Sequence, residues 1–367
     1  MARLPIESSQ SCRVVLDGRE LDYFGGCGYL ALAHHPRVVD ALRAGALQHG
    51  VSAGASRETT GNTRTHERLE SELAQVFGCE AALLLPEGYT ANLAAAQSLA
   101  VDHAVALVDE RSHPSLFDAA ALARLETQRV PHADIRALRR ALDACGSRRA
   151  VLMTDSVFPS RGVIAPLREW SELALGYCAT LLVDDCHGTG VLGSSGRGAL
   201  EHAGIGGEHV LLTSTLSKAL GCYGGFLAGS ADRVARARAV SHVYVGTTPI
   251  PPALAEAARV ALDVAFGSGE LVAQLRANLA VMRAGLARLG IACGSEELPV
   301  FAFALDTAEA MKALEAKLLD EGILAPYIRY PGGPPEGNFR IVISAGHSLV
   351  QIERLLDALS RLRSGVE

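Results

Sequence analysis

The sequence predicts an α/β protein with a large domain built on a mainly parallel sheet, followed by a smaller α+β domain. Two observations carry this prediction. Up to about residue 250, short and almost continuously apolar runs alternate with helix-like segments. This alternation is typical of parallel strands that are buried on both faces and joined by helical crossovers. Beyond residue 250, long helical patterns flank only short apolar runs.

Hydrophobic periodicity sets the expected elements in order. Strands of the large sheet are expected at 81–85, 104–109, 150–155, 179–185, 209–215 and 224–229. Helices between them are expected at 65–77, 90–100, 114–124, 133–144 and 166–176. In the last third, helices are expected at 251–266, 269–289, 308–321 and 348–363, with strands at 299–305 and 338–344.

The change of pattern divides the chain into three parts. Residues 51–250 are expected to form the large domain and residues 251–367 the small one, while residues 1–50 are expected to pack on the small domain. With 367 residues, of which 49% are hydrophobic, the chain can bury a large core.

The composition limits which binding partners and which cellular compartment we expect for this protein. The formal net charge is −6 and no stretch concentrates Lys and Arg, which argues against a nucleic-acid partner. The N-terminus lacks the apolar core of a signal peptide, and no apolar run is long enough to cross a bilayer. The 8 cysteines are scattered without a C-x-x-C pair, so we expect free thiols in the cytoplasm.

Lys218 is an ionisable residue in unusual surroundings. It lies in "TSTLSKALG" (213–221), directly after an expected strand, among small and apolar residues with no carboxylate nearby in sequence. Burial makes the charge of a lysine costly. A lysine that forms an imine with an aldehyde loses that charge, so this position suits a cofactor with an aldehyde group.

Other polar residues follow the expected strands, at the edge of the sheet where open α/β folds bind ligands. The first strand is followed by "EGYTAN" (87–92), a small-residue turn that opens a helix and whose backbone N–H groups suit a phosphate. At the ends of the other strands stand, in chain order, His113, Asp155, Asp184 with His187, and Thr215.

These groups together describe one ligand, pyridoxal 5′-phosphate. The turn and Thr215 would hold its phosphate, Asp184 its ring nitrogen, His113 one face of its ring and Lys218 its aldehyde. A metal ion is not expected, because Asp184 and His187 lack a third ligand. The stretch "GTGVLG" (188–193) also matches the G-x-G-x-x-G of nicotinamide-binding proteins. Loop-type residues follow it where a helix should continue, so we treat this match as accidental.

The motifs "VDDCHGTGVLG" (183–193) and "TSTLSKALG" resemble those of the α-oxoamine synthases, which are pyridoxal phosphate enzymes of fold type I with the fold of aspartate aminotransferase. The resemblance extends from "GYLALAHHPRVVDAL" (28–42) to "FRIVISAGHS" (339–348). It implies that Lys218 is the Schiff-base lysine, and that Asp184 partners the pyridine nitrogen.

The same resemblance implies further contacts. These are His187 on the phenolic oxygen, His113 stacked on the ring, and a phosphate site made by Thr215 with the backbone of Gly88 and Tyr89. Asp155 is included among the cofactor-binding candidates. In "GTTPIPPA" (246–253), the hydroxyl of Thr247 or Thr248 would reach the cofactor phosphate of the partner subunit, which implies a homodimer with shared active sites.

The implied reaction joins a small amino acid to an acyl thioester, carried by CoA or by a carrier protein, with loss of carbon dioxide. Arg340 would bind the carboxylate of the amino acid, since a guanidinium can contact both carboxylate oxygens.

Three departures from the family pattern lie on the substrate side. Cys27 stands where the family has an asparagine, and "FPSRG" (158–162) and "IRYPGGP" (328–334) also differ. They leave open another pyridoxal phosphate reaction on the same fold, namely transamination, retro-aldol cleavage or decarboxylation of an amino acid.

Overall fold

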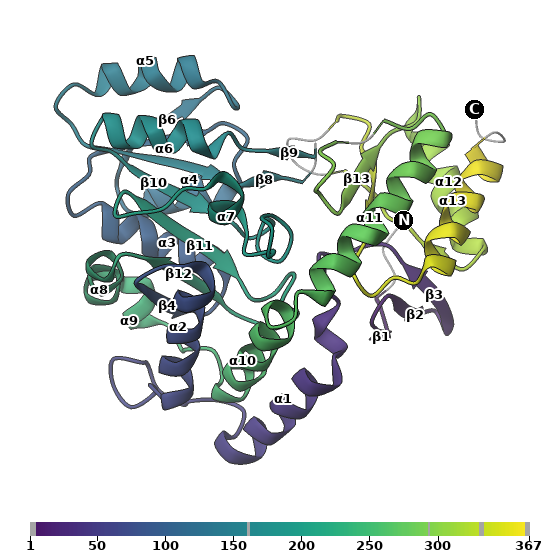
Figure 1. Cartoon of the computed structure of the whole chain (residues 1–367), viewed down its shortest axis with the longest axis horizontal. Coiled ribbons are helices and arrows are strands. Elements are labelled where there is room, and N and C mark those ends of the chain that lie inside the picture. Colours follow the sequence, from purple (N-terminus) through teal and green to yellow (C-terminus); the bar gives the residue numbers. More distant parts are fainter. Residues whose placement is uncertain (1–4, 160–161, 293, 330–333, 364–367) are drawn as a thin grey trace.

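The computed structural model describes residues 5–159, 162–292, 294–329 and 334–363 (Figure 1). Within these residues the central sheet has seven strands in the order β4-β12-β11-β10-β7-β5-β6. Their bounds are β4 Ala81–Leu85, β5 Val105–Asp109, β6 Glu126–Val130, β7 Ala150–Asp155, β10 Thr180–Asp184, β11 Val210–Thr215 and β12 Gly225–Gly229. Neighbouring strands are parallel except where β12 pairs with β11 and β4. The prediction of a mainly parallel sheet is therefore confirmed.

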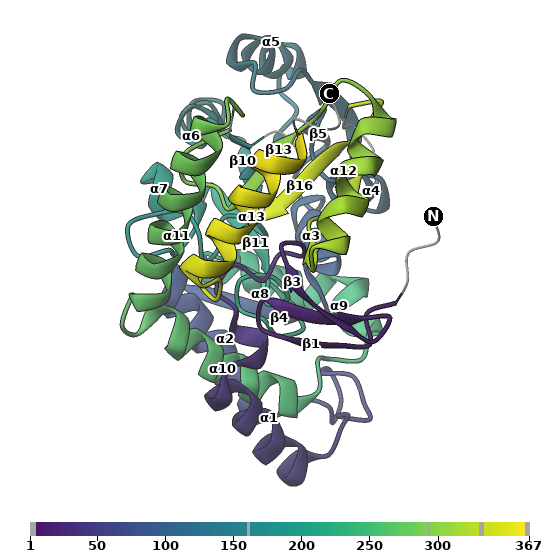
Figure 2. The same cartoon turned by 90° about the vertical axis from the view of Figure 1, so that its right-hand side faces the viewer.

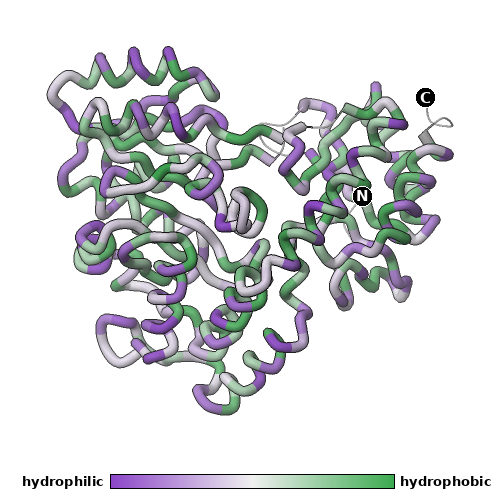
Figure 3. The backbone as a smooth tube through the Cα atoms, viewed as in Figure 1, coloured by the Kyte–Doolittle hydropathy of each residue, from purple (hydrophilic) through white to green (hydrophobic). Residues whose placement is uncertain are grey.

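Helices cover both faces of this sheet, and alternate strand residues point into two separate cores. In β4, Ala82 and Leu84 belong to one core, while Leu83 and Leu85 belong to the other. The helices packed in the first core include α2 Arg64–Phe77, α5 Ile135–Cys145, α6 Leu167–Gly176 and α7 Ala199–Ala203. Those packed in the second are α3 Gly88–Leu99, α4 Pro114–Leu122, α8 Ala231–Val240 and α9 His242–Gly246. Figure 3 shows α5 alternating between hydrophobic and hydrophilic residues, as an amphipathic helix does.

All six strands expected for the large sheet are present, and the expected helices begin and end within two residues of those observed. The strand β6 was not predicted. It lies at the edge of the sheet, and four of its five residues, "ETQR", are exposed, so the run lacks the apolar character of its neighbours. The helix α8 was not predicted either, because "ADRVARARAV" buries only Val234 and Ala237.

The C-terminal third forms a second unit around a small antiparallel sheet in the order β13-β16-β15. The bounds of its elements are α11 Glu270–Arg288, β13 Val300–Phe303, α12 Ala308–Asp320, β14 Ile323–Leu324, β15 Tyr327–Ile328, β16 Asn338–Val342 and α13 Leu349–Arg363. Figure 2 shows α11, α12 and α13 on the outer side of this unit.

Residues near the N-terminus join the two units. The strands β1 Ser8–Gln10, β2 Arg13–Leu16 and β3 Arg19–Tyr23 form a sheet with β14. After the short helix η1 Leu32–His34, the helix α1 Pro36–His49 packs along α10 Pro252–Phe266, which in turn packs on α2. A Cβ on Gly45 would lie 2.8 Å from Cα of Ala253, so glycine permits the close approach of α1 and α10. The expected three-part division of the chain stays a prediction.

A two-stranded hairpin, β8 Val157–Phe158 and β9 Val163–Ile164, extends from the large sheet toward the C-terminal unit (Figure 1). Of the departures noted in the sequence, residues 160–161 and 330–333 lie outside the described residues. Among the helices of the described ranges, none is both long and apolar enough to cross a membrane.

Candidate active site

The expected cofactor-binding residues gather where the parallel strands end. Asp184 at the end of β10 stands in register with Asp155 of β7 and with Thr213 of β11. Because these strands are parallel neighbours, their carboxyl ends lie at one edge of the sheet. The sheet therefore brings together residues that lie far apart in the sequence.

The Asp184 carboxylate is buried and held at both oxygens. Its Oδ1 accepts a hydrogen bond of 2.9 Å from the backbone N–H of Cys186, and its Oδ2 accepts one of 2.6 Å from Nδ2 of Asn92. Asn92 is fully buried on α3, and its own Oδ1 accepts from Oγ1 of Thr213 at 2.5 Å. The sequence analysis did not assign a role to Asn92. The available signal was the polar side chain of Asn92 in the alanine-rich sequence of α3.

The same amide reaches the residues around His113. Nδ2 of Asn92 lies 2.9 Å from Oγ of Ser115, which lies 2.8 Å from Nδ1 of His113. The backbone N–H of His113 donates to Oδ2 of Asp155 at 2.6 Å. Burial, and then the neighbouring Asp184, raise the pKa of Asp155 well above its usual value. Asp155 thus supports the backbone that carries His113, whose side chain is exposed at this edge.

Lys218 lies three residues beyond β11 and is half-buried. Its Nζ is 3.0 Å from Nε2 of His187, and Nδ1 of His187 is 2.7 Å from the hydroxyl of Tyr29. Burial, followed by the positive charges of Lys218 and Arg340, lowers the pKa of His187 well below its usual value. The imidazole is therefore neutral beside Lys218. Tyr29 was not among the expected site residues.

The N-terminus of α3 forms a tight cradle. The helix begins at Gly88, two residues earlier than expected, so its first backbone N–H groups include those of Gly88 and Tyr89, which have no acceptor within the helix. A Cβ on Gly88 would lie 2.9 Å from Sγ of Cys186 and 3.1 Å from Cβ of Thr215. Only a glycine fits there. Thr215 is buried beside it, with its Oγ1 donating to the carbonyl of Gly224 at 3.0 Å.

Tyr89 stands beside the cradle with its ring partly exposed. The ring meets that of His113 edge-on, with centroids 6.3 Å apart, and its hydroxyl donates to the carboxylate of Asp118. The Tyr89 side chain therefore packs at the rim of the site, and its backbone belongs to the cradle.

Arg340 and Cys27, both expected on the substrate side, are in contact. Nη2 of Arg340 lies 3.5 Å from Sγ of Cys27, and Nη1 lies 3.3 Å from the carbonyl oxygen of Gly26. Arg340 extends from β16 of the C-terminal unit. It contributes to the electrostatic environment of both His187 and Tyr29. The C-terminal unit thus supplies a cation to the site formed by the large sheet.

Thr247 and Thr248 lie apart from this cluster, just beyond α9. Oγ1 of Thr247 donates to the carbonyl of Val243 at 2.6 Å, and Thr248 is exposed. Within the described part of the single chain, neither hydroxyl makes a hydrogen bond to the residues around Lys218.

The stretch 188–193 does not open a helix. It forms turns, and α7 begins only at Ala199. This agrees with the interpretation that its match to the dinucleotide motif is accidental. Among the described residues, no group of three or more His, Cys, Asp or Glu side chains is placed to hold a metal ion.

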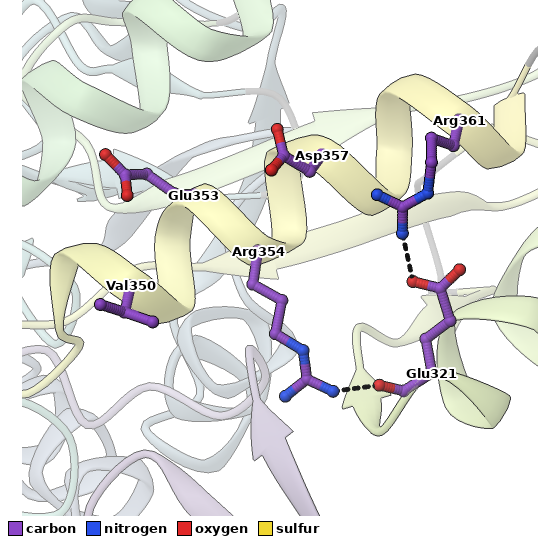
Figure 4. Close-up of a pocket in the computed structure, with 6 residues that line it drawn as sticks. All are labelled: Glu321, Val350, Glu353, Arg354, Asp357 and Arg361. Carbon is purple, nitrogen blue, oxygen red and sulfur yellow. Dashed lines mark hydrogen bonds and ion pairs between the residues drawn. The ribbon is translucent and has the colours of Figure 1, made fainter.

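A surface hollow elsewhere lies on the C-terminal unit, between the end of α12 and α13 (Figure 4). Its lining residues are Glu321, Val350, Glu353, Arg354, Asp357 and Arg361. Arg361 pairs with the carboxylate of Glu321 at 2.8 Å, and Arg354 donates to the Glu321 carbonyl. These groups satisfy one another at the surface, far from the strand ends that carry Lys218.

Comparison with known proteins agrees with this geometry. The family model described as aminotransferase class I and II matches residues 27–359. The chain belongs to this family.

Its relatives narrow the class. The chain is 40% identical to the 8-amino-7-oxononanoate synthase of Thioalkalivibrio sulfidiphilus (strain HL-EbGR7), over 100% of this chain and 94% of that protein. It is also 40% identical to that of Methylococcus capsulatus (strain ATCC 33009 / NCIMB 11132 / Bath), over 97% and 92%. A structure of serine palmitoyltransferase from S. paucimobilis with a bound pyridoxal phosphate–myriocin aldimine superposes with a TM-score of 0.93 at 25% identity, covering 99% of this chain and 93% of that one. The protein is thus a pyridoxal-phosphate-dependent α-oxoamine synthase, an acyltransferase that forms a carbon–carbon bond.

The residues of the site fit pyridoxal phosphate. The carboxylate of Asp184 is oriented by two donors, as a partner for a protonated ring nitrogen requires. Gly88 lets the N-terminus of α3 pack closely against Cys186 and Thr215, where a Cβ would crowd both side chains. The amine of Lys218 stands next to a neutral imidazole. The carboxylate, the cradle and the amine therefore match the ring nitrogen, the phosphate and the aldehyde of this cofactor, respectively.

Proposed function

We propose that the enzyme forms an α-amino ketone of the 8-amino-7-oxononanoate type. The observation that carries this proposal is the 40% identity over the full chain to a protein of that name. Arg340 supports it, because its positive charge acts on His187 beside Lys218, and a cation there suits an amino-acid carboxylate.

The chemistry of that product defines the two substrates. In an 8-amino-7-oxo acid of nine carbons, the new bond joins the acyl carbonyl carbon, C7, to the α-carbon of the amino acid, C8. The remaining carbon, C9, is then the methyl group of alanine, since its carboxylate leaves as carbon dioxide. The acyl donor is a seven-carbon dicarboxylic acid held as a monothioester, and the thiol is released.

Each residue of the site has a proposed role. When bound, the cofactor supplies an electron sink for the amino-acid α-carbon. Lys218 holds the cofactor aldehyde and then moves the proton at that α-carbon. Asp184 keeps the ring nitrogen protonated, and His113 packs against one ring face. His187 donates to the phenolic oxygen, and Thr215 with the backbone of Gly88 and Tyr89 holds the phosphate.

On the substrate side, Arg340 would bind the carboxylate of the amino acid. Cys27, where the family has an asparagine, offers only a weak donor and acceptor to that carboxylate. A thiol next to the guanidinium therefore leaves Arg340 as the main anchor. Transamination, retro-aldol cleavage and decarboxylation are not favoured, because the relatives at 40% identity are synthases.

The proposed working unit is a homodimer. Thr248 is exposed, so its hydroxyl can donate to the cofactor phosphate of a partner subunit. Thr247 lies next to it, and its hydroxyl would have to give up its bond to the carbonyl of Val243 to do the same. The cysteines of the described ranges are free, which supports a reducing compartment, and we place the enzyme in the cytoplasm.

The test is an assay of purified holoenzyme with alanine and the CoA thioester of heptanedioic acid. We expect equimolar thiol and carbon dioxide, and a product with the mass of 8-amino-7-oxononanoate. Serine with a sixteen-carbon acyl-CoA is the rival pair, suggested by the similarity to serine palmitoyltransferase. Lys218→Ala protein is the control; it should lack activity, and borohydride should not attach the cofactor to the chain. Turnover of the rival pair alone would overturn the proposal.

A further inference from the structure

A line of five side chains runs from the C-terminal unit to the residues that follow β11. Arg340 contacts Cys27 and contributes, with it, to the electrostatic environment of the Tyr29 hydroxyl. That hydroxyl is 2.7 Å from Nδ1 of His187, and Nε2 of His187 is 3.0 Å from Nζ of Lys218. The line joins the expected carboxylate anchor to the expected cofactor lysine, and Tyr29 is the member to which the proposed function assigns no role.

Tyr29 is held in place from several sides. Its side chain is 1% exposed, and its backbone carbonyl accepts from the N–H of Ala345 at 2.8 Å. Burial, as the main cause, raises the pKa of its phenol well above the usual value, so the hydroxyl keeps its proton. It therefore faces His187 as a group that can both donate and accept a hydrogen bond.

The imidazole of His187 needs such a group because Nε2 faces two different partners in turn. The amine of Lys218 requires a proton on Nδ1, and the phenolic oxygen of the cofactor requires a proton on Nε2. While Lys218 is a free amine, its N–H donates to Nε2, so the ring proton is on Nδ1 and points to the oxygen of Tyr29. In the role proposed above, Nε2 instead donates to the phenolic oxygen of the cofactor. Nδ1 must then accept, and the only hydroxyl placed at it among the described residues is that of Tyr29.

We propose that Tyr29 is a positioning residue that acts through His187, keeping a hydrogen-bonding partner at Nδ1 in both tautomers so that Nε2 can change from acceptor to donor. This inference rests on the proposed roles of Lys218 and His187. Without the hydroxyl, the tautomer with the proton on Nε2 leaves a buried Nδ1 without a donor, which costs free energy.

The readout is the pH at which the visible band of the bound cofactor changes in the holoenzyme. Donation from His187 stabilises the negative charge on the phenolic oxygen, which weakens the hold of the adjoining Lys218 nitrogen on its proton. In Tyr29→Phe this donation is impaired, so Nζ keeps its proton to higher pH. We expect the midpoint to rise by roughly 0.5–1 pH unit, the equivalent of one hydrogen bond.

Tyr244→Phe is the matched control. Tyr244 is also buried, but its hydroxyl accepts from Nη1 of Arg238 at 3.0 Å. Its loss should leave the midpoint unchanged.

A second variant at Tyr29 avoids any packing defect. Replacement of Tyr29 by 3-fluorotyrosine makes the phenol a stronger donor and should lower the midpoint.

A double-mutant cycle tests whether Tyr29 acts through His187. In the His187→Ala background, Tyr29→Phe should cause no further shift. An unchanged midpoint in both Tyr29 variants, or an equal shift with and without His187, would overturn the inference while leaving the proposed function standing. If borohydride reduction of the holoenzyme without amino acid did not attach the cofactor to Lys218, the assignment of Lys218 would instead fail, and this inference with it.

Discussion

Asn92 donates a hydrogen bond of 2.6 Å from its side-chain amide to Oδ2 of Asp184, and this contact joins α3 to the end of β10. The helix whose first turn is the proposed phosphate site therefore also orients the carboxylate of Asp184. In the proposed arrangement one rigid element would position both ends of the cofactor, since Gly88 and Asn92 lie one turn apart on α3.

We predict that Asn92→Ala weakens cofactor binding about tenfold or more, because it removes a charge-assisted hydrogen bond to a buried carboxylate. The dissociation constant of the cofactor, measured by fluorescence quenching, tests this. Ser98→Ala is the control on the same helix, since its hydroxyl donates only to the carbonyl of Ala95 at 2.7 Å. Equal affinity in both variants would show that Asn92 does not orient Asp184.

Arg340→Ala should raise the KM for the amino acid by one to three orders of magnitude, roughly the 1.5–3 kcal/mol of a charged hydrogen bond plus that of its bidentate partner. Cofactor binding should persist, because Arg340 comes from the C-terminal unit and not from the strand ends. Steady-state kinetics with alanine measure the effect. Arg361→Ala, which removes a surface pair with Glu321, is the control. An unchanged KM in Arg340→Ala would place the carboxylate elsewhere.

Cys27→Asn should change the affinity for the amino acid or the preference among amino acids, with the cofactor still bound. An amide can donate to and accept from a carboxylate neighbour, whereas a thiol does both weakly. The measurement is kcat/KM for alanine, serine and glycine in the variant and in the unmodified enzyme. Identical ratios in both proteins would mean that residue 27 has no part in selecting the substrate.

Asp185 should make the protein less stable as the pH rises from about 4 to about 7. Burial raises the pKa of this carboxyl from 3.8 to about 7, although hydrogen bonds from Ser156, Ala199 and Thr189 oppose the shift. Between these two pH values the folded state holds a proton that the unfolded state has released, so unfolding becomes more favourable as the pH increases.

Denaturant unfolding of apoprotein at several pH values measures this slope. In Asp185→Asn the contribution of this residue to the slope between about pH 4 and 7 should disappear, because the amide does not titrate in this range. Asp357→Asn, on the exposed side of α13, should keep the original slope. A slope that survives in Asp185→Asn would assign it to other buried carboxyls, of which Asp155 is the nearest candidate.

Shared active sites predict complementation between two inactive proteins. If each site combines Lys218 of one subunit with Thr247 and Thr248 of the other, a hybrid of Lys218→Ala with Thr247→Val/Thr248→Val has one intact site. A random mixture should then recover up to about a quarter of the original activity, since half of the dimers are hybrids. The activity of co-refolded mixtures tests this. Recovery no greater than the average of the two parents would show that the threonines serve their own subunit.

The sequence alone determined six of the seven strands of the large sheet and singled out Lys218 as the candidate cofactor lysine. Runs such as "AVLMTD" and "ATLLVDD" are apolar on both faces, and this local pattern is sufficient to predict a buried parallel strand. Lys218 was recognisable because it stands alone among small and apolar residues directly after a predicted strand. The edge strand β6 was missed because its sequence is polar. Its pairing with β5 makes it a strand, and the sequence does not show this pairing.

The tertiary structure alone decided which polar groups support one another. Asn92 meets Asp184 across 92 residues, and Tyr29 meets His187 across 158. No local pattern encodes such pairs, because they depend on the order of strands in the sheet and on the packing of the C-terminal unit against it. A hydrogen bond forms only when both partners are brought within about 3 Å. The candidate site residues could therefore be predicted from the sequence, whereas their hydrogen-bond partners are determined by the tertiary structure.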